Sequence, residues 1–381
     1  MNGIKAKTIF SIVLASVCFK AEAQSSALKI ADSLYASGNY SNAINQYAKV
    51  GTPRASQQIA KAYNVIGNFE KAILQYESVV AKDSSLILAK FELGKLYVKI
   101  KDNKKATSVF QKLVFNQPNN PEFYYYLGRS STDLEERLKA YKKAVKIDST
   151  HLRSIFKLGK YYVVKREKDS VLKYVNKGLS FYSSDVSLIN LKALAYFNNA
   201  NYEEAAILFE RLLELKEYKE HVYEKLGHSY LKELEIYKAK KAYLSTLEIN
   251  DENERILNGL GDLYLKEKQL DSSEYYFKES IKVQHIVLDK EYMSLARIAR
   301  IRNDIPKAIF YYKLAFKEDT SNFRSYYQIC VLYDQYSKDS KGKLRYYERF
   351  IEKFGTKKGY FSLLVKKRIA ELKEEGHVSK K

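Results

Sequence analysis

Residues 87–120, ILAKFELGKLYVKIKDNKKATSVFQKLVFNQPNN, contain one copy of a pattern that recurs along the chain. The copy combines Leu-Gly-x-x-Tyr at 93–97 with Ala-x-x-x-Phe at 106–110. The first element recurs at 158–162, 226–230 and 260–264, and the second, ending in Phe or Tyr, at 72–76, 205–209, 239–243 and 308–312. Copies in adjacent units start 34 residues apart, as at 72 and 106, at 205 and 239, and at 226 and 260. A fixed period of this length predicts a solenoid of stacked units and argues against a single globular enzyme core.

The pattern resembles that of the tetratricopeptide repeat family, whose unit is a pair of antiparallel helices. Residues 87–120 carry every element of the family's pattern except the first aromatic, which Lys90 replaces. The resemblance implies an all-α fold, a right-handed α-solenoid of about ten helical hairpins. The expected units are 24–52, 53–86, 87–120, 121–151, 152–185, 186–219, 220–253, 254–288, 289–322 and 323–356.

Both ends of the chain differ from the repeats. Residues 1–23 combine a basic start, a short apolar run and Ala21-Glu22-Ala23, which predicts a cleaved signal peptide and an exported protein in the periplasm or at the outer membrane. An uncleaved anchor, and lipidation at Cys18, stay open as alternatives. After the solenoid at 24–356, residues 357–376 place Phe361, Leu364, Val365, Ile369 and Leu372 on one helical face. They predict a capping helix, followed by a disordered tail at 377–381.

Cys330 is the only cysteine after residue 23, so no internal disulfide is expected in the exported chain. It occupies the position where other repeats carry Gly or Ala. This placement predicts a buried structural thiol.

The chain is strongly basic, with 66 Lys and Arg against 45 Asp and Glu. For an exported protein, this excess favours acidic proteins, anionic glycans or lipid headgroups as partners over nucleic acid. A lysine-rich, well-solvated surface without a specific partner is the alternative.

The sequence contains none of the common catalytic or nucleotide-binding motifs, and we expect neither enzymatic activity nor a cofactor. His221, Glu224 and His228 share one helical face at a spacing that zinc or copper ligands use. Because no fourth ligand is visible, a polar helix face is the preferred interpretation.

The resemblance implies that the first helix of each unit lines a concave groove, through positions two, five, nine and twelve of the motif. Lysine or arginine occupies position nine of the motif in four units and position two in one unit. An aromatic residue occupies position five in three units. The resulting candidate binding residues are Lys61, Phe91, Lys95, Tyr125, Arg129, Arg153, Phe156 and Lys160.

Such alternating aromatic and cationic side chains suit an extended or helical peptide with acidic and apolar residues. We therefore expect a non-catalytic protein–protein interaction scaffold that binds an acidic segment of another protein. A binder of anionic envelope glycan or lipid, and a metal-binding or enzyme-accessory protein, are the alternatives. The candidate residues are also compatible with incidental groove surface.

Overall fold

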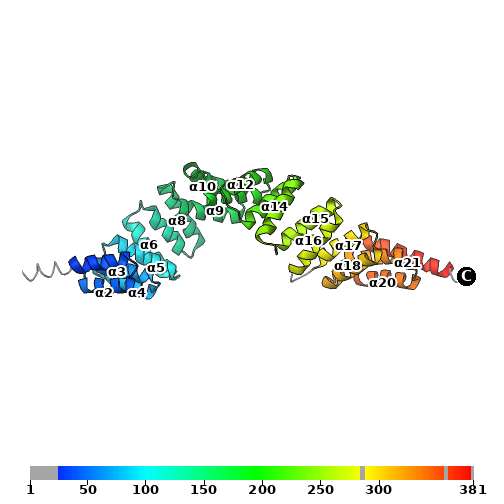
Figure 1. Ribbon diagram of the computed structural model, residues 1–381, viewed down its shortest axis with the longest axis horizontal. Helices are drawn as coiled ribbons and strands as arrows, with labels where there is room; N and C mark the ends of the chain where they lie inside the picture. The colour runs from blue at the N-terminus through cyan, green and yellow to red at the C-terminus, as the bar shows by residue number, and fades with distance from the viewer. Residues whose placement is uncertain (1–24, 284–287, 356–358, 379–381) are drawn as a thin grey trace, which may run out of the picture. The chain divides into compact units, whose positions relative to one another are not determined.

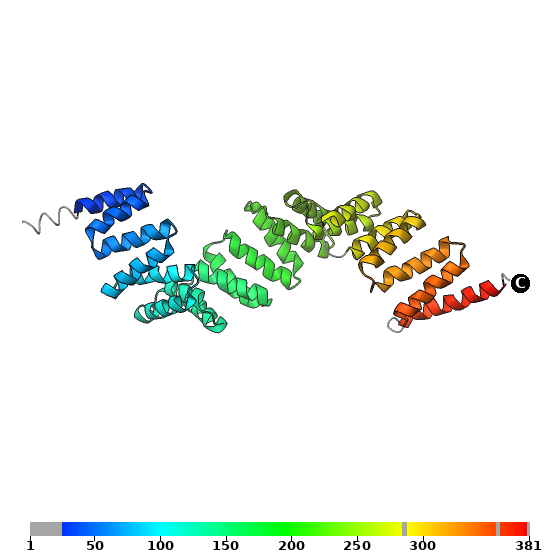
Figure 2. The same ribbon diagram turned by 90° about the horizontal axis from the view of Figure 1, so that it is seen from below.

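The computed structural model describes residues 25–283, 288–355 and 359–378, which are helical throughout and contain no strand. Consecutive helices pair into antiparallel hairpins, and each helix packs against its neighbours in the chain (Figures 1 and 2). The predicted signal peptide at 1–23 lies outside the described residues. In the described part, no helix is both long and apolar enough to cross a membrane.

The described residues form ten hairpins and one final helix, and the fold is an α-solenoid of the predicted kind. The first five hairpins are 25–36 with α2 (Tyr40–Val50), α3 (Pro53–Val65) with α4 (Phe69–Lys82), α5 (Ile87–Lys99) with α6 (Asn103–Asn116), α7 (Pro121–Ser130) with α8 (Leu134–Ile147), and α9 (Leu152–Lys165) with α10 (Lys168–Phe181). The others are α11 (Val186–Asn198) with α12 (Tyr202–Glu214), α13 (Glu220–Lys232) with α14 (Ile236–Ile249), α15 (Glu254–Lys266) with α16 (Leu270–Val283), α17 (Asp289–Ile301) with α18 (Ile305–Glu318), and α19 (Phe323–Tyr336) with α20 (Ser340–Phe354). The final helix is α21 (Gly359–Val378).

The hairpins divide into two compact units, an N-terminal unit up to Leu191 and a C-terminal unit from Lys192 onward. Within each unit, first helices of neighbouring hairpins also touch, as α5 does with α7 and α15 with α17. These first helices are the ones on which the candidate binding residues were predicted.

The two helices of most hairpins are joined by one residue in the left-handed conformation. At Lys101, φ is 64°, and the following Asp102 donates its backbone N–H to Tyr97 O at 2.9 Å while its side chain accepts from Lys105 N at 3.1 Å. The first contact ends α5 and the second begins α6. Glycine fits this conformation best, yet most hairpins carry another residue there. The equivalent residues include Gly38, Gly67, Arg166, Ala200, Leu234, Lys268 and Asn303.

The recurring small and aromatic residues form the core of each hairpin. A Cβ on Gly94 would lie 2.7 Å from the Phe110 ring, so the helices approach too closely there for a larger residue. The Phe110 ring also stacks on Tyr126 of the next hairpin, with centroids 5.3 Å apart. One aromatic thus joins two repeats.

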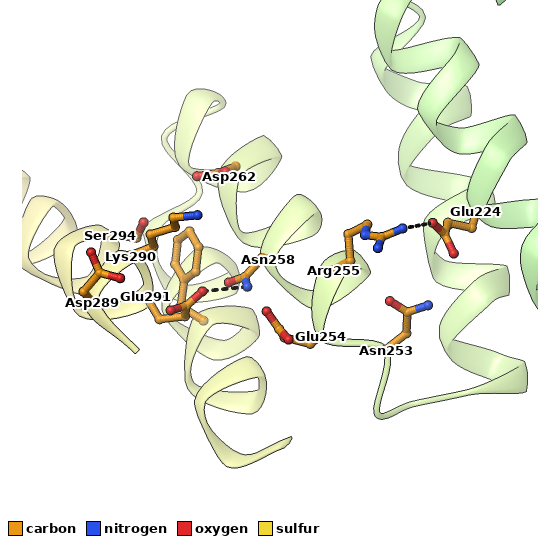
Figure 3. A pocket seen from close by; sticks show the side chains of 11 residues that line it. Glu224, Asn253, Glu254, Arg255, Asn258, Asp262, Asp289, Lys290, Glu291 and Ser294 are labelled. Carbon is orange, nitrogen blue, oxygen red and sulfur yellow. Dashed lines mark hydrogen bonds and ion pairs between the residues drawn. The ribbon is translucent and has the colours of Figure 1, made fainter. Parts of the chain in front are cut away.

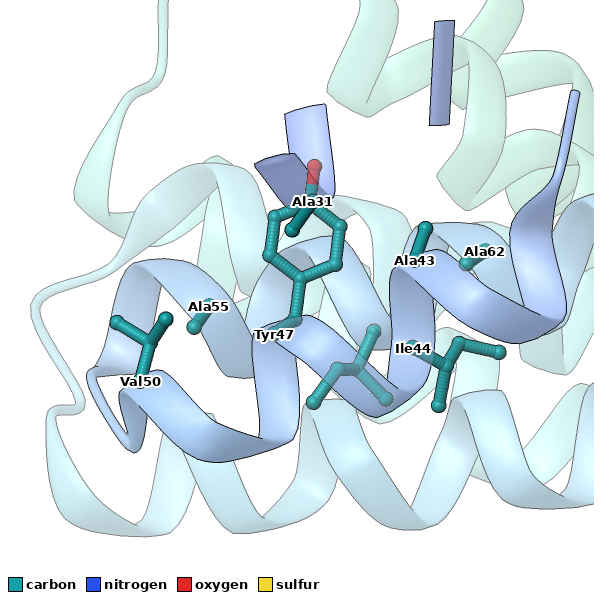
Figure 4. Close-up of a cluster of buried hydrophobic side chains, with 8 residues drawn as sticks. Ala31, Ala43, Ile44, Tyr47, Val50, Ala55 and Ala62 are labelled. Carbon is teal, nitrogen blue, oxygen red and sulfur yellow. The ribbon is translucent and has the colours of Figure 1, made fainter. Parts of the chain in front are cut away.

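The first hairpins build the same kind of core from smaller side chains. Figure 4 shows Tyr47 of α2 among Ala31, Ala43 and Ala55, which come from three successive helices. All four side chains are buried. Alanines at these positions let the helices approach closely enough to enclose the ring.

The last helix, α21, packs an apolar face on α19 and α20. Val365 and Leu372 are buried in one cluster with Phe350 and with Cys330, whose thiol donates to Tyr346 O at 3.4 Å. Cys330 is therefore the buried thiol that was predicted. Leu364, which we expected on the same face, is exposed because it lies at the rim of this contact.

An ion pair also holds α21 in place. The Arg368 guanidinium donates to both carboxylate oxygens of Asp334, at 2.7 and 3.2 Å, and Lys343 approaches the same carboxylate at 3.1 Å. Although burial alone would raise the pKa of Asp334, the hydrogen bonds from these two cations lower it. The helix thus continues to Val378, two residues into the predicted tail, whose positions 379–381 lie outside the described residues.

Candidate functional site

The eight candidate residues lie on four first helices of the N-terminal unit. Lys61 is on α3, Phe91 and Lys95 are on α5, Tyr125 and Arg129 are on α7, and Arg153, Phe156 and Lys160 are on α9. Two hollows beside these helices contain five of the eight. Lys61 is exposed and lines neither hollow.

The smaller hollow, about 240 Å³, lies along α5 and α7 and contains Lys95 and Arg129. The Lys95 ammonium is 2.9 Å from the Glu92 carboxylate and 5.3 Å from the centre of the Phe91 ring. Its charge is therefore already compensated by a residue of its own helix. Phe91 packs against Phe110, Phe123 and Tyr126 and belongs largely to the core.

The larger hollow, about 340 Å³, contains Tyr125, Arg153, Phe156 and Lys157. Tyr125 is only 6% exposed, so it forms part of the floor and does not project as a separate contact. The Arg153 guanidinium lies 4.8 Å from the centre of the Tyr125 ring and forms an ion pair with Glu122. Phe156 is half-buried at the wall of the hollow.

Glu92 and Glu122 are the residues that the sequence analysis missed on this surface. Glu122 accepts from Arg153 and also lies 3.2 Å from the Nε2 atom of His151, a buried side chain that caps α9. Glu122 occupies position two of its repeat, so its position alone marked it as a groove residue. Glu92 stands three residues before Lys95, the spacing of a helical ion pair. The cationic ladder is therefore partly neutralised.

Arg129 on α7 and Lys157 and Lys160 on α9 form no ion pair with an acid of the described residues, and neither do Lys61 on α3 and Lys99 on α5. We call Arg129, Lys157 and Lys160 the basic patch. Burial lowers the pKa of Lys157, and the nearby charges of Arg129 and Lys160 lower it further. Lys157 was not predicted, although it shares position six with Glu92. Because like charges repel each other here, the patch favours an anionic group that would lie among them.

The histidine constellation of the C-terminal unit is not assembled as a metal site. Glu224 accepts from Arg255 at 2.7 Å, and His228 packs against the rings of Phe197 and Tyr202. Across the described part of the chain, no group of three His, Cys, Asp or Glu side chains is arranged to hold a metal ion. Burial and neighbouring lysines lower the pKa of His228, which disfavours its charged form.

Comparisons with known proteins agree with the repeat assignment. A family model described as tetratricopeptide repeat matches residues 186–219, the α11–α12 hairpin. None of the curated proteins compared with the sequence matches it.

Three similar solved structures are tetratricopeptide or related helical proteins. YrrB, described as having an unusual peptide-binding site, is 16% identical with a TM-score of 0.45, over 49% of this chain and 96% of YrrB. PilF from Pseudomonas aeruginosa is 18% identical with a TM-score of 0.44, over 56% and 97%. A tetratricopeptide repeat protein from Parabacteroides merdae is 14% identical with a TM-score of 0.44, over 65% and 98%.

Proposed function

We propose that this chain, which is built of tetratricopeptide repeats, is a non-catalytic protein-interaction scaffold whose basic patch binds an acidic segment of a partner protein. The repeat fold supports the general role, because stacked hairpins present many side chains along one extended surface. The acidic character of the partner is our inference from the charges on α7 and α9.

The observation that carries this proposal is the unpaired state of Arg129, Lys157 and Lys160. Glu92 is paired with Lys95 and Glu122 with Arg153, while Asp185, the acid that lines the larger hollow, accepts from Leu188 N at 2.9 Å. Carboxylates of a partner would meet these three cations, and the adjoining hollow with Phe156 would accept an apolar side chain. An acidic peptide with interspersed apolar residues therefore matches this surface in charge and shape.

The test measures binding of a fluorescein-labelled peptide that alternates Asp with Leu and Phe, by fluorescence anisotropy. The triple variant Arg129→Glu, Lys157→Glu, Lys160→Glu should bind at least about tenfold more weakly, since each charge pair contributes roughly 0.2–1 kcal/mol and each is reversed. Its melting temperature should stay close to that of the wild type, because three cations that repel each other are replaced by three anions that repel each other about equally.

The matched control reverses three cations that are exposed on second helices of the same unit: Lys104, Lys112 and Lys146. This control changes the net charge equally and should keep the affinity of the wild type. Equal weakening in both triple variants would show that binding follows net charge alone, as expected for an anionic glycan or lipid. Binding of phosphatidylglycerol vesicles by the wild type that both variants weaken equally would support that alternative.

We also propose that the protein is exported, on the basis of the basic start and short apolar run in residues 1–23. Cell fractionation with N-terminal sequencing tests this proposal. A protein that starts at Gln24 in the periplasmic or outer-membrane fraction is expected. An intact N-terminus in the cytoplasmic fraction would contradict it.

A further inference from the structure

A hollow with a marked charge lies in the C-terminal unit, far along the sequence from the basic patch. It measures about 660 Å³ and lies along the first helices α13, α15 and α17 (Figure 3). Its lining is mainly acidic and polar: Glu224, Asn253, Glu254, Arg255, Asn258, Asp262, Phe277, Asp289, Lys290, Glu291 and Ser294.

The two cations of the lining do not neutralise its five carboxylates. The Arg255 guanidinium is directed to Glu224, with 2.7 Å between Nη1 and Oε1 (Figure 3). Lys290 is exposed, and the described residues contain no ion pair formed by it. Glu254, Asp262 and Glu291 therefore form no ion pair within the described chain.

The burial of the Glu291 carboxylate is not explained by a role in capping its helix. Only 4% of it is exposed, and its Oε1 atom accepts from Asn258 Nδ2 at 2.7 Å. Its Oε2 atom is buried and has no hydrogen-bond partner. Acids in the first turn of a helix interact well with the helix dipole, but they do so from solvent. A buried carboxylate oxygen without a donor is costly and indicates that a donor is supplied from outside.

The surrounding acids also favour a cation as the group that supplies the missing donor. Burial raises the pKa of Glu291. Hydrogen bonds from its own backbone N–H and from Asn258 act in the opposite direction, while the charges of Glu254 and Asp289 raise it further. Burial likewise raises the pKa of Asp262, although Arg297 and Lys266 act in the opposite direction. Figure 3 shows Glu291, Asn258 and Glu254 next to one another, so a donor placed between them would meet three acceptors.

The geometry of the hollow favours an organic cation over a metal ion as its ligand. No three carboxylates of the described residues converge closely enough to hold a metal, and the hollow is much wider than a bare ion. A guanidinium carries five N–H donors in a plane and suits acceptors that are spread over two helices. We propose that this hollow binds the guanidinium group of an arginine side chain on a partner polypeptide. Glu291 and Asn258 are the central acceptors, and Glu254 and Asp262 supply further negative charge.

This site is independent of the proposed function, because it takes the opposite charge and lies in the other unit. One chain would then bind an acidic segment on α7 and α9 and an arginine on α15 and α17. The two binding sites are compatible because each pair of neighbouring first helices forms its own surface. A substitution in one repeat therefore leaves distant repeats unchanged.

The test uses two labelled peptides that differ in one functional group, Gly-Arg-Gly-Arg-Gly and the same peptide with citrulline for arginine. Citrulline keeps the shape and removes the charge. The wild type should bind the arginine peptide and discriminate against the citrulline peptide by about tenfold or more, the effect of one charge-assisted hydrogen bond. Equal binding of the two peptides would overturn the proposal.

Glu291→Gln keeps the side-chain shape, should reduce arginine-peptide affinity about tenfold, and should not lower the melting temperature, because it removes a buried charge. Glu248→Gln, an equal charge change on an exposed residue of α14, should bind within twofold of the wild type, about the noise expected for a remote surface site. If Glu291→Gln lowers the melting temperature, Asp262→Asn must show the weaker binding instead, because the Asp262 side chain is exposed to solvent although its neighbours partly desolvate the carboxylate. Unchanged affinity in Glu291→Gln would refute the arginine site. The basic-patch triple variant should bind the arginine peptide normally, which separates this result from that of the proposed function.

Discussion

Two glycines of α15 should respond in opposite directions when each is replaced by alanine. A Cβ on Gly261 would lie 2.8 Å from Cε1 of Phe277 and 2.9 Å from two further atoms of the same ring. Phe277 is 2% exposed, so its ring has little room to move. A Cβ on Gly259 would lie 3.3 Å from one atom of the Tyr243 ring, which needs to shift by only a few tenths of an ångström.

The expected difference follows from two effects. In a helix interior, replacing Gly by Ala stabilises by roughly 0.8–1 kcal/mol, and this gain is common to both variants. Overpacking a filled core costs about 1–3 kcal/mol and applies in full only at Gly261. We therefore expect Gly261→Ala to destabilise by up to about 2 kcal/mol and Gly259→Ala to stabilise by up to about 1 kcal/mol.

Thermal melts and urea unfolding followed by circular dichroism measure this difference. A destabilisation of 1 kcal/mol shifts the melting temperature by roughly 2–4 °C in a domain of this size class. Because repeat arrays can unfold in parts, hydrogen exchange of α15 and α16 amides should report the change locally. Shifts of the same sign and size in both variants would show that close packing at Gly261 does not limit the hairpin.

The remaining predictions concern a turn, the cap and a charged cluster. Leu234, 80% exposed with φ of 62°, pairs a left-handed backbone with a bulky side chain, so Leu234→Gly should raise the melting temperature. Asp334→Asn weakens the ion pair that anchors α21 and should increase hydrogen exchange in α21 before the rest of the C-terminal unit; uniform protection would contradict this. Burial alone would raise the pKa of Glu274, but hydrogen bonds from Lys278 and Arg302 lower it to about 2. Its contribution to stability is thus fully present above its ordinary pKa near 4.5 and is lost as the pH falls toward 2. Glu274→Gln should therefore lower the melting temperature at pH 7 by an amount that vanishes near pH 2, and a difference independent of pH would refute this account.

The hairpins could be predicted in detail because their signals are local. Leu-Gly-x-x-Tyr and Ala-x-x-x-Phe report which faces of two adjacent helices meet, and contacts such as Gly94 with Phe110 span only 16 residues. Helix periodicity and the 34-residue step therefore suffice to place every predicted groove residue on a first helix. The pair of Glu92 and Lys95 is equally local and could have been recognised from its spacing.

The charge of the groove was harder to predict because it depends on contacts between repeats. Glu122 on α7 meets Arg153 on α9, 31 residues later, and Glu224 on α13 meets Arg255 on α15 over the same separation. Spacing within one helix does not reveal such a pair, because the contact depends on how the first helices of neighbouring repeats pack.

The sequence alone determined the repeat unit, the buried small and aromatic positions and the set of helices that face the groove, because these follow from spacing along a helix and between adjacent helices. Only the tertiary structure decided which charges are compensated. It left Arg129, Lys157 and Lys160 without acids on one surface and one oxygen of the Glu291 carboxylate without a donor on another. The physical reason is that the electrostatic potential at a site is the sum of contributions from side chains of several repeats. The distances between these side chains depend on packing rather than on sequence spacing.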